Sequence, residues 1–228
     1  MKNSLIIPLA IIAGGGILAI ALWVSIRETA LPTQGEPAAT IAAISPLMPQ
    51  DTVLGNPSAP VILINYTDFE CSHCRDFALT LRRVGETYGV QGTVAIMYRN
   101  FPITERSENA KQHARAAECV ARVAGTTSYL AFTDLLYHDQ PVAPTKHGEL
   151  AQKAGANSVE VLACVRSAAT NGIDAKIDRE RAEVMQSGAI GTPHTLMLVR
   201  GADSVVLPGA WGYADLRDVI DSALEAIR

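Results

Sequence analysis

The sequence predicts an α/β fold that carries a helical insertion and follows one transmembrane helix. Two apolar runs of strand length, residues 61–64 and 94–98, flank a segment with helical spacing. Residues 107–187 are largely helical in pattern, and two more strand-like runs and a helix follow them. This order of elements predicts one domain with a sheet at its centre.

Composition limits the size and the partners of this domain. The chain has 228 residues, of which 48% are hydrophobic and 18% charged, so it can bury one ordinary core and a small additional part. The formal net charge of −4 argues against a nucleic-acid partner, which would require a basic surface. Four cysteines in two plausible pairs suit an oxidising compartment better than the cytosol.

Residues 1–28 are predicted to anchor the chain in the cytoplasmic membrane. Residues 5–26 carry no charged side chain, and as a helix they would span ~33 Å, close to the hydrocarbon thickness of a bilayer. A cleaved signal peptide is the alternative, since Ala19-Ile20-Ala21 has small residues at the usual spacing. The apolar run continues to Ile26, which favours an uncleaved, single-pass anchor. Both alternatives place the rest of the chain on the periplasmic or extracytoplasmic side.

Residues 29–52 are predicted to be a tether, and residues 53–228 the folded domain. The tether is rich in Pro, Ala and Thr and shows no sustained periodicity. Such a segment is extended, and semi-rigid where prolines cluster. We expect it to hold the domain away from the membrane surface.

The domain is predicted to begin with a strand, a helix and a strand. The run 61–64 is apolar without alternation, as in a central strand that is covered on both faces. Phe77, Leu81 and Val84 then recur at helical spacing, and the run 94–98 is a second buried strand. A unit of this length makes two parallel strands with a right-handed crossover.

Short helices and then a hairpin are predicted for the rest of the domain. The helical segments are 109–123, 127–137, 146–154 and 159–167. The charged segment 174–183 is most simply a helix surface that faces solvent. Strands are expected at 195–199 and 205–207, antiparallel across a glycine turn, with a closing helix over 214–227.

The chemistry of the chain is expected at Cys71 and Cys74, three positions apart where a strand ends and a helix begins. The free N–H groups and partial positive charge of a helix start stabilise a thiolate at Cys71. His73, when protonated, favours the same thiolate. Cys71 is therefore predicted to be the attacking sulfur and Cys74 the resolving one.

The same spacing also occurs in half of a zinc site. A zinc ribbon or finger needs a second pair of ligands, and the sequence holds no second Cys-x-x-Cys and no His-x-x-x-His. The other cysteines, Cys119 and Cys164, stand alone. The pattern therefore favours a redox pair over a metal site.

Two motifs together resemble the DsbA-like branch of the thioredoxin family. Asp68-Phe69-Glu70-Cys71-x-x-Cys74 follows a strand, Gly191-Thr192-Pro193 precedes another, and a helical block lies between them. The resemblance covers about residues 53–228 and implies a thioredoxin fold with a helical insertion at about 107–187. It also implies a protein thiol-disulfide oxidoreductase.

The resemblance assigns roles to residues outside the cysteine pair. In that family the Gly-Thr-Pro motif holds a cis-proline whose loop lies against the Cys-x-x-Cys turn, which gives this role to Pro193. Thr192 is expected to offer backbone hydrogen bonds to an extended substrate. Apart from the resemblance, Ser72 and His194 are also expected to bind substrate. His194 could face the active site and add positive charge near Cys71, and a strand position that points elsewhere is the alternative.

Two positions depart from the family pattern. The family often places a carboxylate six residues before the first cysteine, where it moves protons for the buried thiol, and here that position is Asn65. Water or another acid then takes the proton, or turnover is slower. The dipeptide between the cysteines is commonly Pro-His, and here it is Ser72-His73. Retention of His73 favours an acidic Cys71, and a low thiol pKa makes the disulfide an oxidant.

Cys119 and Cys164 are predicted to form a structural disulfide inside the helical insertion. The bridge would close a loop of about 45 residues and contribute ~4 kcal/mol in the chain-entropy model. Two buried free thiols are the alternative, since cysteine packs as a small hydrophobe. Export favours the bridge.

Several other residues have plain structural explanations. Three scattered histidines are expected to be solvated or to cap helices, namely His113, His138 and His147. Three methionines are expected to fill the core, namely Met97, Met185 and Met197. Trp211 is expected to pack ahead of the last helix.

We expect an enzyme that forms or rearranges disulfides in other exported, cysteine-containing proteins through Cys71 and Cys74. The resemblance implies a membrane redox partner of the DsbB kind and no metal, flavin or nucleotide cofactor. A disulfide isomerase or reductase that a membrane partner keeps reduced is an alternative, and Thr192 is compatible with it. A client-binding chaperone without redox activity is another alternative, as is a metal carrier that uses the cysteines and His73.

Overall fold

The computed structural model describes residues 44–45 and 47–228, which belong to one compact unit. The predicted membrane anchor and most of the predicted tether lie outside the described residues. In the described part of the chain, none of the helices has the length and apolar character needed to cross a membrane.

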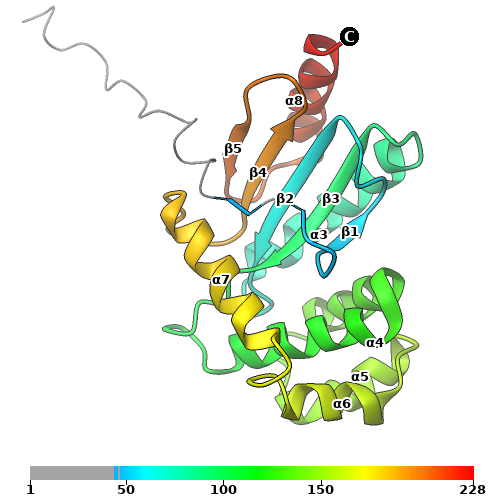
Figure 1. The fold of residues 1–228 in the computed structure, drawn as a ribbon, viewed down its shortest axis with the longest axis vertical. Coiled ribbons are helices and arrows are strands. Elements are labelled where there is room, and N and C mark those ends of the chain that lie inside the picture. The colour runs from blue at the N-terminus through cyan, green and yellow to red at the C-terminus, as the bar shows by residue number, and fades with distance from the viewer. Residues whose placement is uncertain (1–43, 46) are drawn as a thin grey trace, which may run out of the picture. The chain divides into compact units, whose positions relative to one another are not determined.

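Five strands form one sheet in the order β1-β3-β2-β4-β5 (Figure 1). They are β1 (Thr52–Leu54), β2 (Val61–Thr67), β3 (Val94–Asn100), β4 (His194–Val199) and β5 (Val205–Pro208). Strands β2 and β3 are parallel, and the other neighbouring pairs are antiparallel. The predicted parallel pair and closing hairpin are therefore confirmed. The sequence does not predict β1, because three residues are too few to show a periodicity.

The helices follow the predicted order. They are α3 (Ser72–Val84), α4 (Asn109–His138), α5 (His147–Lys153), α6 (Ser158–Arg166), α7 (Ile173–Gln186) and α8 (Tyr213–Ala226). A π-helical segment, η1 (Gly85–Gly89), extends α3, and a short 3-10 turn, η2 (Pro144–Lys146), precedes α5.

Helices α3 and α8 pack together on one face of the sheet (Figure 1). Helix α3 buries Phe77, Leu81 and Val84, the residues at helical spacing, in a cluster with Leu63 of β2 and Leu216 of α8. Burying each such side chain contributes about 1.5–3 kcal/mol. This packing fixes the start of α3, and the cysteine motif with it, at the end of β2.

The helical insertion is built on α4, which is kinked. The predicted helices at 109–123 and 127–137 are one run in the structure, with a break at Gly125, where φ is 80° and ψ is −176°. Essentially only glycine adopts this backbone conformation. Helices α5 and α6 pack on α4, and a disulfide joins Cys119 of α4 to Cys164 of α6.

The expectation that residues 174–183 face solvent is wrong for three of their charged side chains. Lys176, Glu180 and Glu183 are buried. Lys176 Nζ lies 2.5 Å from Glu118 Oε1 of α4 and 2.7 Å from Glu180 Oε1. Helix α7 packs against the end of β3 rather than projecting into solvent, and paired charges satisfy each other in this interface.

Arg99 of β3 connects α7 to the N-terminal end of the described chain. Its guanidinium donates to Tyr66 OH and Glu183 Oε2, both at 3.2 Å. It also donates to Ser45 O at 3.0 Å and to Asp51 Oδ2 at 3.1 Å. The last residues of the predicted tether are therefore held on the folded domain.

The residues predicted to pack in the interior are buried to different degrees. Met97 and Met197 are buried, and Trp211 is partly buried against the α3–α8 cluster. Met185, near the end of α7, is 48% exposed instead of filling the core. A helical position close to an element's end is the least constrained by periodicity, since the chain can turn away there.

Candidate active site

A tight turn places Cys71 at the start of α3. The Cys71 N–H donates to Asp68 O at 3.2 Å, and Cys71 has the extended backbone of a helix N-cap, with φ −91° and ψ 121°. The buried Asp68 carboxylate holds the turn, because it accepts hydrogen bonds of 2.8 Å from the N–H groups of Glu70 and Ile103. The backbone N–H groups at the start of α3 therefore point toward the Cys71 sulfur.

The surroundings of the Cys71 sulfur favour its thiolate. The pKa of Cys71 is lowered to about 5, first because the Cys74 thiol donates a hydrogen bond to it, and then because of Thr192 and the backbone N–H groups of Cys74 and His73. Partial burial opposes this shift. Cys71 Sγ lies 3.4 Å from Thr192 O, to which it donates as a thiol.

Cys74 has the opposite environment. Its side chain is buried, and its pKa is raised well above the ordinary value, mainly by burial and then by the neighbouring Cys71. Both cysteines are free thiols in this structure. The partly exposed, acidic sulfur is the one that a substrate can reach, which agrees with the roles expected for Cys71 and Cys74.

The loop before β4 completes the sulfur's surroundings. The Thr192–Pro193 peptide bond is cis, as the resemblance implies. The hydroxyl of Thr192 is buried and, among the residues that the structure describes, has no hydrogen-bond partner while Cys71 is a thiol. A Cys71 thiolate gives this hydroxyl an acceptor, and that contact is one of the causes that lower the Cys71 pKa.

The other predicted site residues are placed as follows. Ser72 and His73 are exposed, and the contribution of residue 73 to the thiolate comes from its backbone N–H. The electrostatic role of the His73 imidazole and the substrate contact of Ser72 stay predictions. His194 begins β4 and is buried, with Nε2 unpaired. Burial lowers the pKa of His194, so the structure does not support the positive charge expected from it near Cys71.

Asn65 is buried in β2 and cannot act as a proton acceptor in place of a carboxylate. Its side-chain amide donates to Thr195 Oγ1 of the neighbouring strand at 3.0 Å. Asp68 is the buried acid beside the cysteines instead. Burial raises the pKa of Asp68, and the charge of Cys71 is one of the smaller causes in the same direction. Asp68 is therefore a buried acid next to the cysteine motif of a chain that has an amide at position 65.

The sequence analysis missed a chain of three side chains next to the cysteines. His113 Nε2 lies 2.5 Å from Glu70 Oε1, and His113 Nδ1 lies 2.7 Å from His147 Nε2. Both histidines are buried, so the expectation that they are solvated or capping is wrong, whereas His138 is exposed. Burial lowers the pKa of both, to about 4 for His147.

The two contacts suit one pair of tautomers. A carboxylate oxygen accepts from Nε2 of a neutral His113, whose Nδ1 then accepts in turn. His147 then donates from Nε2. The chain fixes the Glu70 side chain, directly before Cys71, to α4 and α5. No sequence pattern predicts this chain of side chains, because Glu70, His113 and His147 lie at least 34 positions apart along the sequence.

Among the described residues, no group of three or more His, Cys, Asp or Glu side chains is arranged to hold a metal ion. The site is a dithiol at a helix start, with a cis-proline loop beside the first sulfur.

Fold and site together define the class of this protein, a thiol-disulfide oxidoreductase. The chain belongs to the thioredoxin family, since residues 48–200 match the family model described as Thioredoxin. Its fold is the DsbA-like variant of the family, in which helices are inserted between the strands.

Solved structures share this fold. The thiol-disulfide exchange protein alpha-DsbA2 from Wolbachia pipientis is 19% identical, with a TM-score of 0.67 over 82% of this chain and 96% of that one. A thioredoxin-like oxidoreductase from Silicibacter pomeroyi DSS-3 is 25% identical, with a TM-score of 0.62 over 78% and 94%. DsbA2 from Pseudomonas aeruginosa is 19% identical, with a TM-score of 0.62 over 77% and 95%.

Curated proteins match over shorter segments. The Na(+)/H(+) antiporter NhaA 1 of Mycolicibacterium gilvum (strain PYR-GCK) is 31% identical over 112 residues, which is 48% of this chain and 18% of the antiporter. The antiporter of the same name from Mycobacterium sp. (strain KMS) is 29% identical over 107 residues. The chain thus spans less than a fifth of the length of these relatives.

Proposed function

We propose that this protein forms or rearranges disulfides in exported, cysteine-containing proteins on the extracytoplasmic side of the membrane. The observation that carries the proposal is the asymmetry of the pair: the pKa of the accessible Cys71 is lowered to about 5, and that of the buried Cys74 is raised. A stabilised thiolate favours the reduced pair, so the Cys71–Cys74 disulfide is an oxidant.

The reaction begins from the Cys71–Cys74 disulfide. A client thiolate attacks Cys71 Sγ, the bond between the two cysteines breaks, and Cys74 leaves with the electron pair. A second client thiolate then attacks the client sulfur of the mixed disulfide, which releases Cys71 as a thiolate. The client gains one disulfide, and its two electrons reduce the pair.

Cys74 must take up a proton when it leaves, because burial raises its pKa. Asp68 is the described acid at hand for this transfer. It is buried, its backbone N–H donates to the Cys74 sulfur, and burial raises the pKa of its carboxyl group. We assign the proton transfer to Asp68. It would replace the carboxylate that the family often has at the position of Asn65.

The N-terminal stretch 5–26 supports a membrane location, with the oxidoreductase domain outside the cytoplasm. A membrane redox partner of the DsbB kind would reoxidise Cys71 and Cys74 after each turnover. A reporter fused at the C-terminus, active only outside the cytoplasm, tests the location. Activity of a reporter that works only in the cytoplasm contradicts it.

The deciding experiment is the equilibrium of the Cys71–Cys74 pair with glutathione. If the protein is an oxidase, Cys71 and Cys74 should stay largely reduced even at ratios of reduced to oxidised glutathione at which ordinary structural disulfides remain intact. An equilibrium close to that of glutathione itself supports the isomerase or reductase instead. The variant Cys71→Ser distinguishes both kinds of redox enzyme from a chaperone. Its redox activity on a reduced client is lost in either enzyme. Its ability to protect a client from aggregation persists only if client binding is the function.

A further inference from the structure

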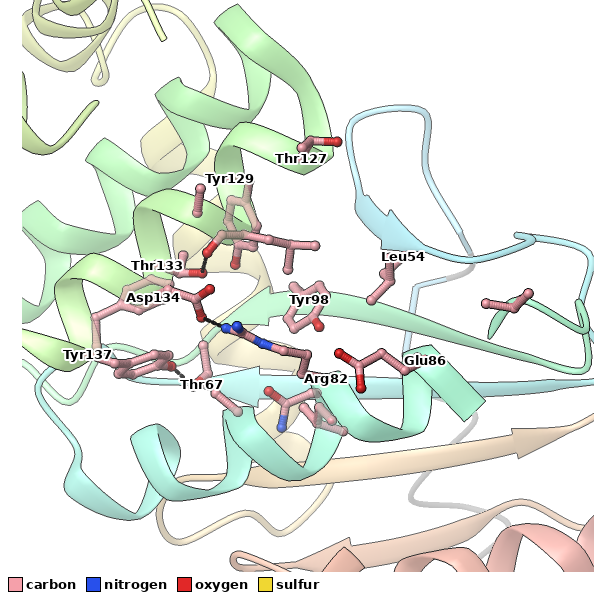
Figure 2. A pocket seen from close by; sticks show the side chains of 18 residues that line it. Leu54, Thr67, Arg82, Glu86, Tyr98, Thr127, Tyr129, Thr133, Asp134 and Tyr137 are labelled. Carbon is pink, nitrogen blue, oxygen red and sulfur yellow. Dashed lines mark hydrogen bonds and ion pairs between the residues drawn. The ribbon is translucent and has the colours of Figure 1, made fainter. Parts of the chain in front are cut away.

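A cavity of about 460 Å³ lies between α3, β1, β3 and the second half of α4 (Figure 2). Apolar side chains make most of its wall, among them Leu54, Phe69, Leu81 and Leu130. The two active-site cysteines do not line it, so the disulfide chemistry leaves the cavity without a role. Its volume is that of a small-molecule site, for which the usual range is about 300–1,000 Å³.

Two tyrosine hydroxyls at this cavity have no hydrogen-bond partner in the described part of the chain. Tyr98 of β3 and Tyr129 of α4 both line it, with ring centroids 5.7 Å apart and tilted planes (Figure 2). Among the described residues neither hydroxyl has a hydrogen-bond partner, although Tyr129 is only 2% exposed. The hydroxyl of Tyr137 in the same wall is bonded instead, at 2.6 Å to Thr67 Oγ1. Neither oxygen is among the fully buried atoms that lack a partner, so both hydroxyls open onto the cavity and can donate to a molecule inside it.

The two phenols can serve only as neutral groups. Burial raises the pKa of both Tyr98 and Tyr129, so their hydroxyls keep their hydrogen atoms at any ordinary pH. A ligand that completes their hydrogen bonds must therefore accept, and an uncharged oxygen suits a wall that is otherwise apolar.

The charged groups of the cavity exclude an anion. Arg82 forms an ion pair with Asp134, drawn as a dashed line in Figure 2. Glu86 is exposed and has no ion pair within the described part of the chain. The three groups together carry a net negative charge, and no cation is left over for a carboxylate or a phosphate.

We propose that this cavity is a binding site for a neutral apolar molecule that carries a hydrogen-bond-accepting oxygen, such as a ketone or an ester. The apolar walls hold the body of the molecule, and Tyr98 and Tyr129 donate to its oxygen. This binding site is independent of the proposed disulfide chemistry, so a test of one does not decide the other.

The test compares three naphthalene probes on the full chain in lipid nanodiscs. The probes are 2-acetylnaphthalene, which has a neutral acceptor, naphthalene-2-carboxylate, which is an anion, and 2-ethylnaphthalene, which has no acceptor. The readout is the NMR signal of the labelled Tyr137 ring, which lines the cavity and is kept in every variant. A probe molecule that dissolves in the lipid does not contact this ring and therefore does not shift its signal. We expect a saturable shift with the ketone, which binds at least ~10-fold more tightly than either other probe.

The double variant Tyr98→Phe/Tyr129→Phe keeps both rings and removes only hydroxyls that have no protein partner. We expect its affinity for the ketone to fall ~10-fold, to the level of 2-ethylnaphthalene, and each single variant to fall between. Tyr213→Phe, outside the cavity, is the control and leaves the affinity unchanged. The proposal is overturned if the ketone produces no saturable shift, if the carboxylate binds as tightly, or if the double variant binds the ketone like the parent chain.

Discussion

Two thiols three positions apart in the same turn have opposite acidities because of what surrounds each sulfur. Cys71 stands at a helix start and accepts hydrogen bonds, whereas Cys74 is 2% exposed in a cluster with residues of the helical insertion. The pattern Cys-x-x-Cys alone predicts the pair. The depth of Cys74 depends on packing against the helical insertion, and Thr192 approaches from a loop 121 positions after Cys71, so no local pattern reports either of them.

Thr192 offers a direct test of this asymmetry. The variant Thr192→Val removes the hydroxyl that a Cys71 thiolate can accept from, so the Cys71 pKa should rise by about 0.7 units, from a hydrogen bond of about 1 kcal/mol. The thiolate absorbance against pH measures the shift, and the glutathione equilibrium should become less oxidising. Thr127→Val, away from the sulfurs, is the matched control. An unchanged titration curve in Thr192→Val contradicts the assigned contact.

The Cys71 pKa also makes the stability of the reduced protein depend on pH. The group is an acid whose pKa is lowered in the fold, to about 5 from an ordinary value of 9.0. Its contribution is therefore complete above the ordinary value, shrinks as the pH falls, and is lost below about pH 5. Between those limits the reduced form should gain stability over the disulfide form by at most about 1.4 kcal/mol per pH unit, and less because Cys71 is partly solvated.

Urea unfolding of the reduced and disulfide forms at a series of pH values measures this difference. The double variant Cys71→Ser/Cys74→Ser should lack the pH-dependent gain that the reduced parent shows. A constant difference between the two forms of the parent from pH 5 to pH 9 shows that the fold does not lower the Cys71 pKa.

The chain Glu70–His113–His147 should matter for stability as well. Replacing His113 by Phe leaves a buried imidazole and a carboxylate without their partner, which costs about 1–3 kcal/mol for each unpaired group. Chemical denaturation measures the loss. His138→Phe is the control, since His138 is exposed and should change stability by less than about 0.5 kcal/mol. Equal effects of the two variants contradict a structural role for the chain.

At the scale of elements, the order of strands and helices follows from the sequence. The apolar runs at 61–64 and 94–98 lie inside β2 and β3, and each predicted helix corresponds to one of the helices α3 to α8 or to a half of α4. The break at Gly125 agrees with the predicted boundary between the helices at 109–123 and 127–137. Two features do not follow, namely the short strand β1 and the burial of the charged face of α7. Periodicity describes one element at a time, whereas burial of α7 depends on where β3 ends.

The disulfide within the insertion ties α4 to α6. Cys119 and Cys164 are 45 positions apart, so removing the bridge should cost up to ~4 kcal/mol through the entropy of the unfolded chain. The double variant Cys119→Ala/Cys164→Ala tests this by chemical denaturation. Its Cys71 titration should match that of the parent protein. If the double variant remains folded but Cys71 is no longer acidic, the disulfide is not independent of the active site.

At the scale of the whole molecule, buried charges join the sheet to the helical insertion. Lys176 pairs with Glu118 of α4 and with Glu180, and Asn100 of β3 donates to Glu180 through both its backbone and its side chain. The sequence does not predict this cluster, because the same charged residues are equally typical of a helix face exposed to solvent. Such a network determines how the parts dock even where it adds little net stability.

Lys176 is the residue whose loss the molecule should tolerate least. Lys176→Met leaves two buried carboxylates with no cation between them, which should cost about 3–5 kcal/mol. Lys111→Met removes a similar but partly exposed pair with Asp178 and should cost about 1 kcal/mol or less. Thermal and urea unfolding of the two variants decide the matter. Similar losses in both would falsify the view that the cluster holds the insertion on the sheet.

The depth of the second sulfur affects how the oxidation state of this protein must be counted. A bulky alkylating reagent added to the folded, reduced protein reaches only Cys71, and a single adduct would look like a half-oxidised sample. The same reagent added in a denaturant at neutral pH, with the structural bridge intact, reaches two sulfurs. Mass-shift assays in cells therefore need quenching under denaturing conditions before any ratio of forms is read from a gel.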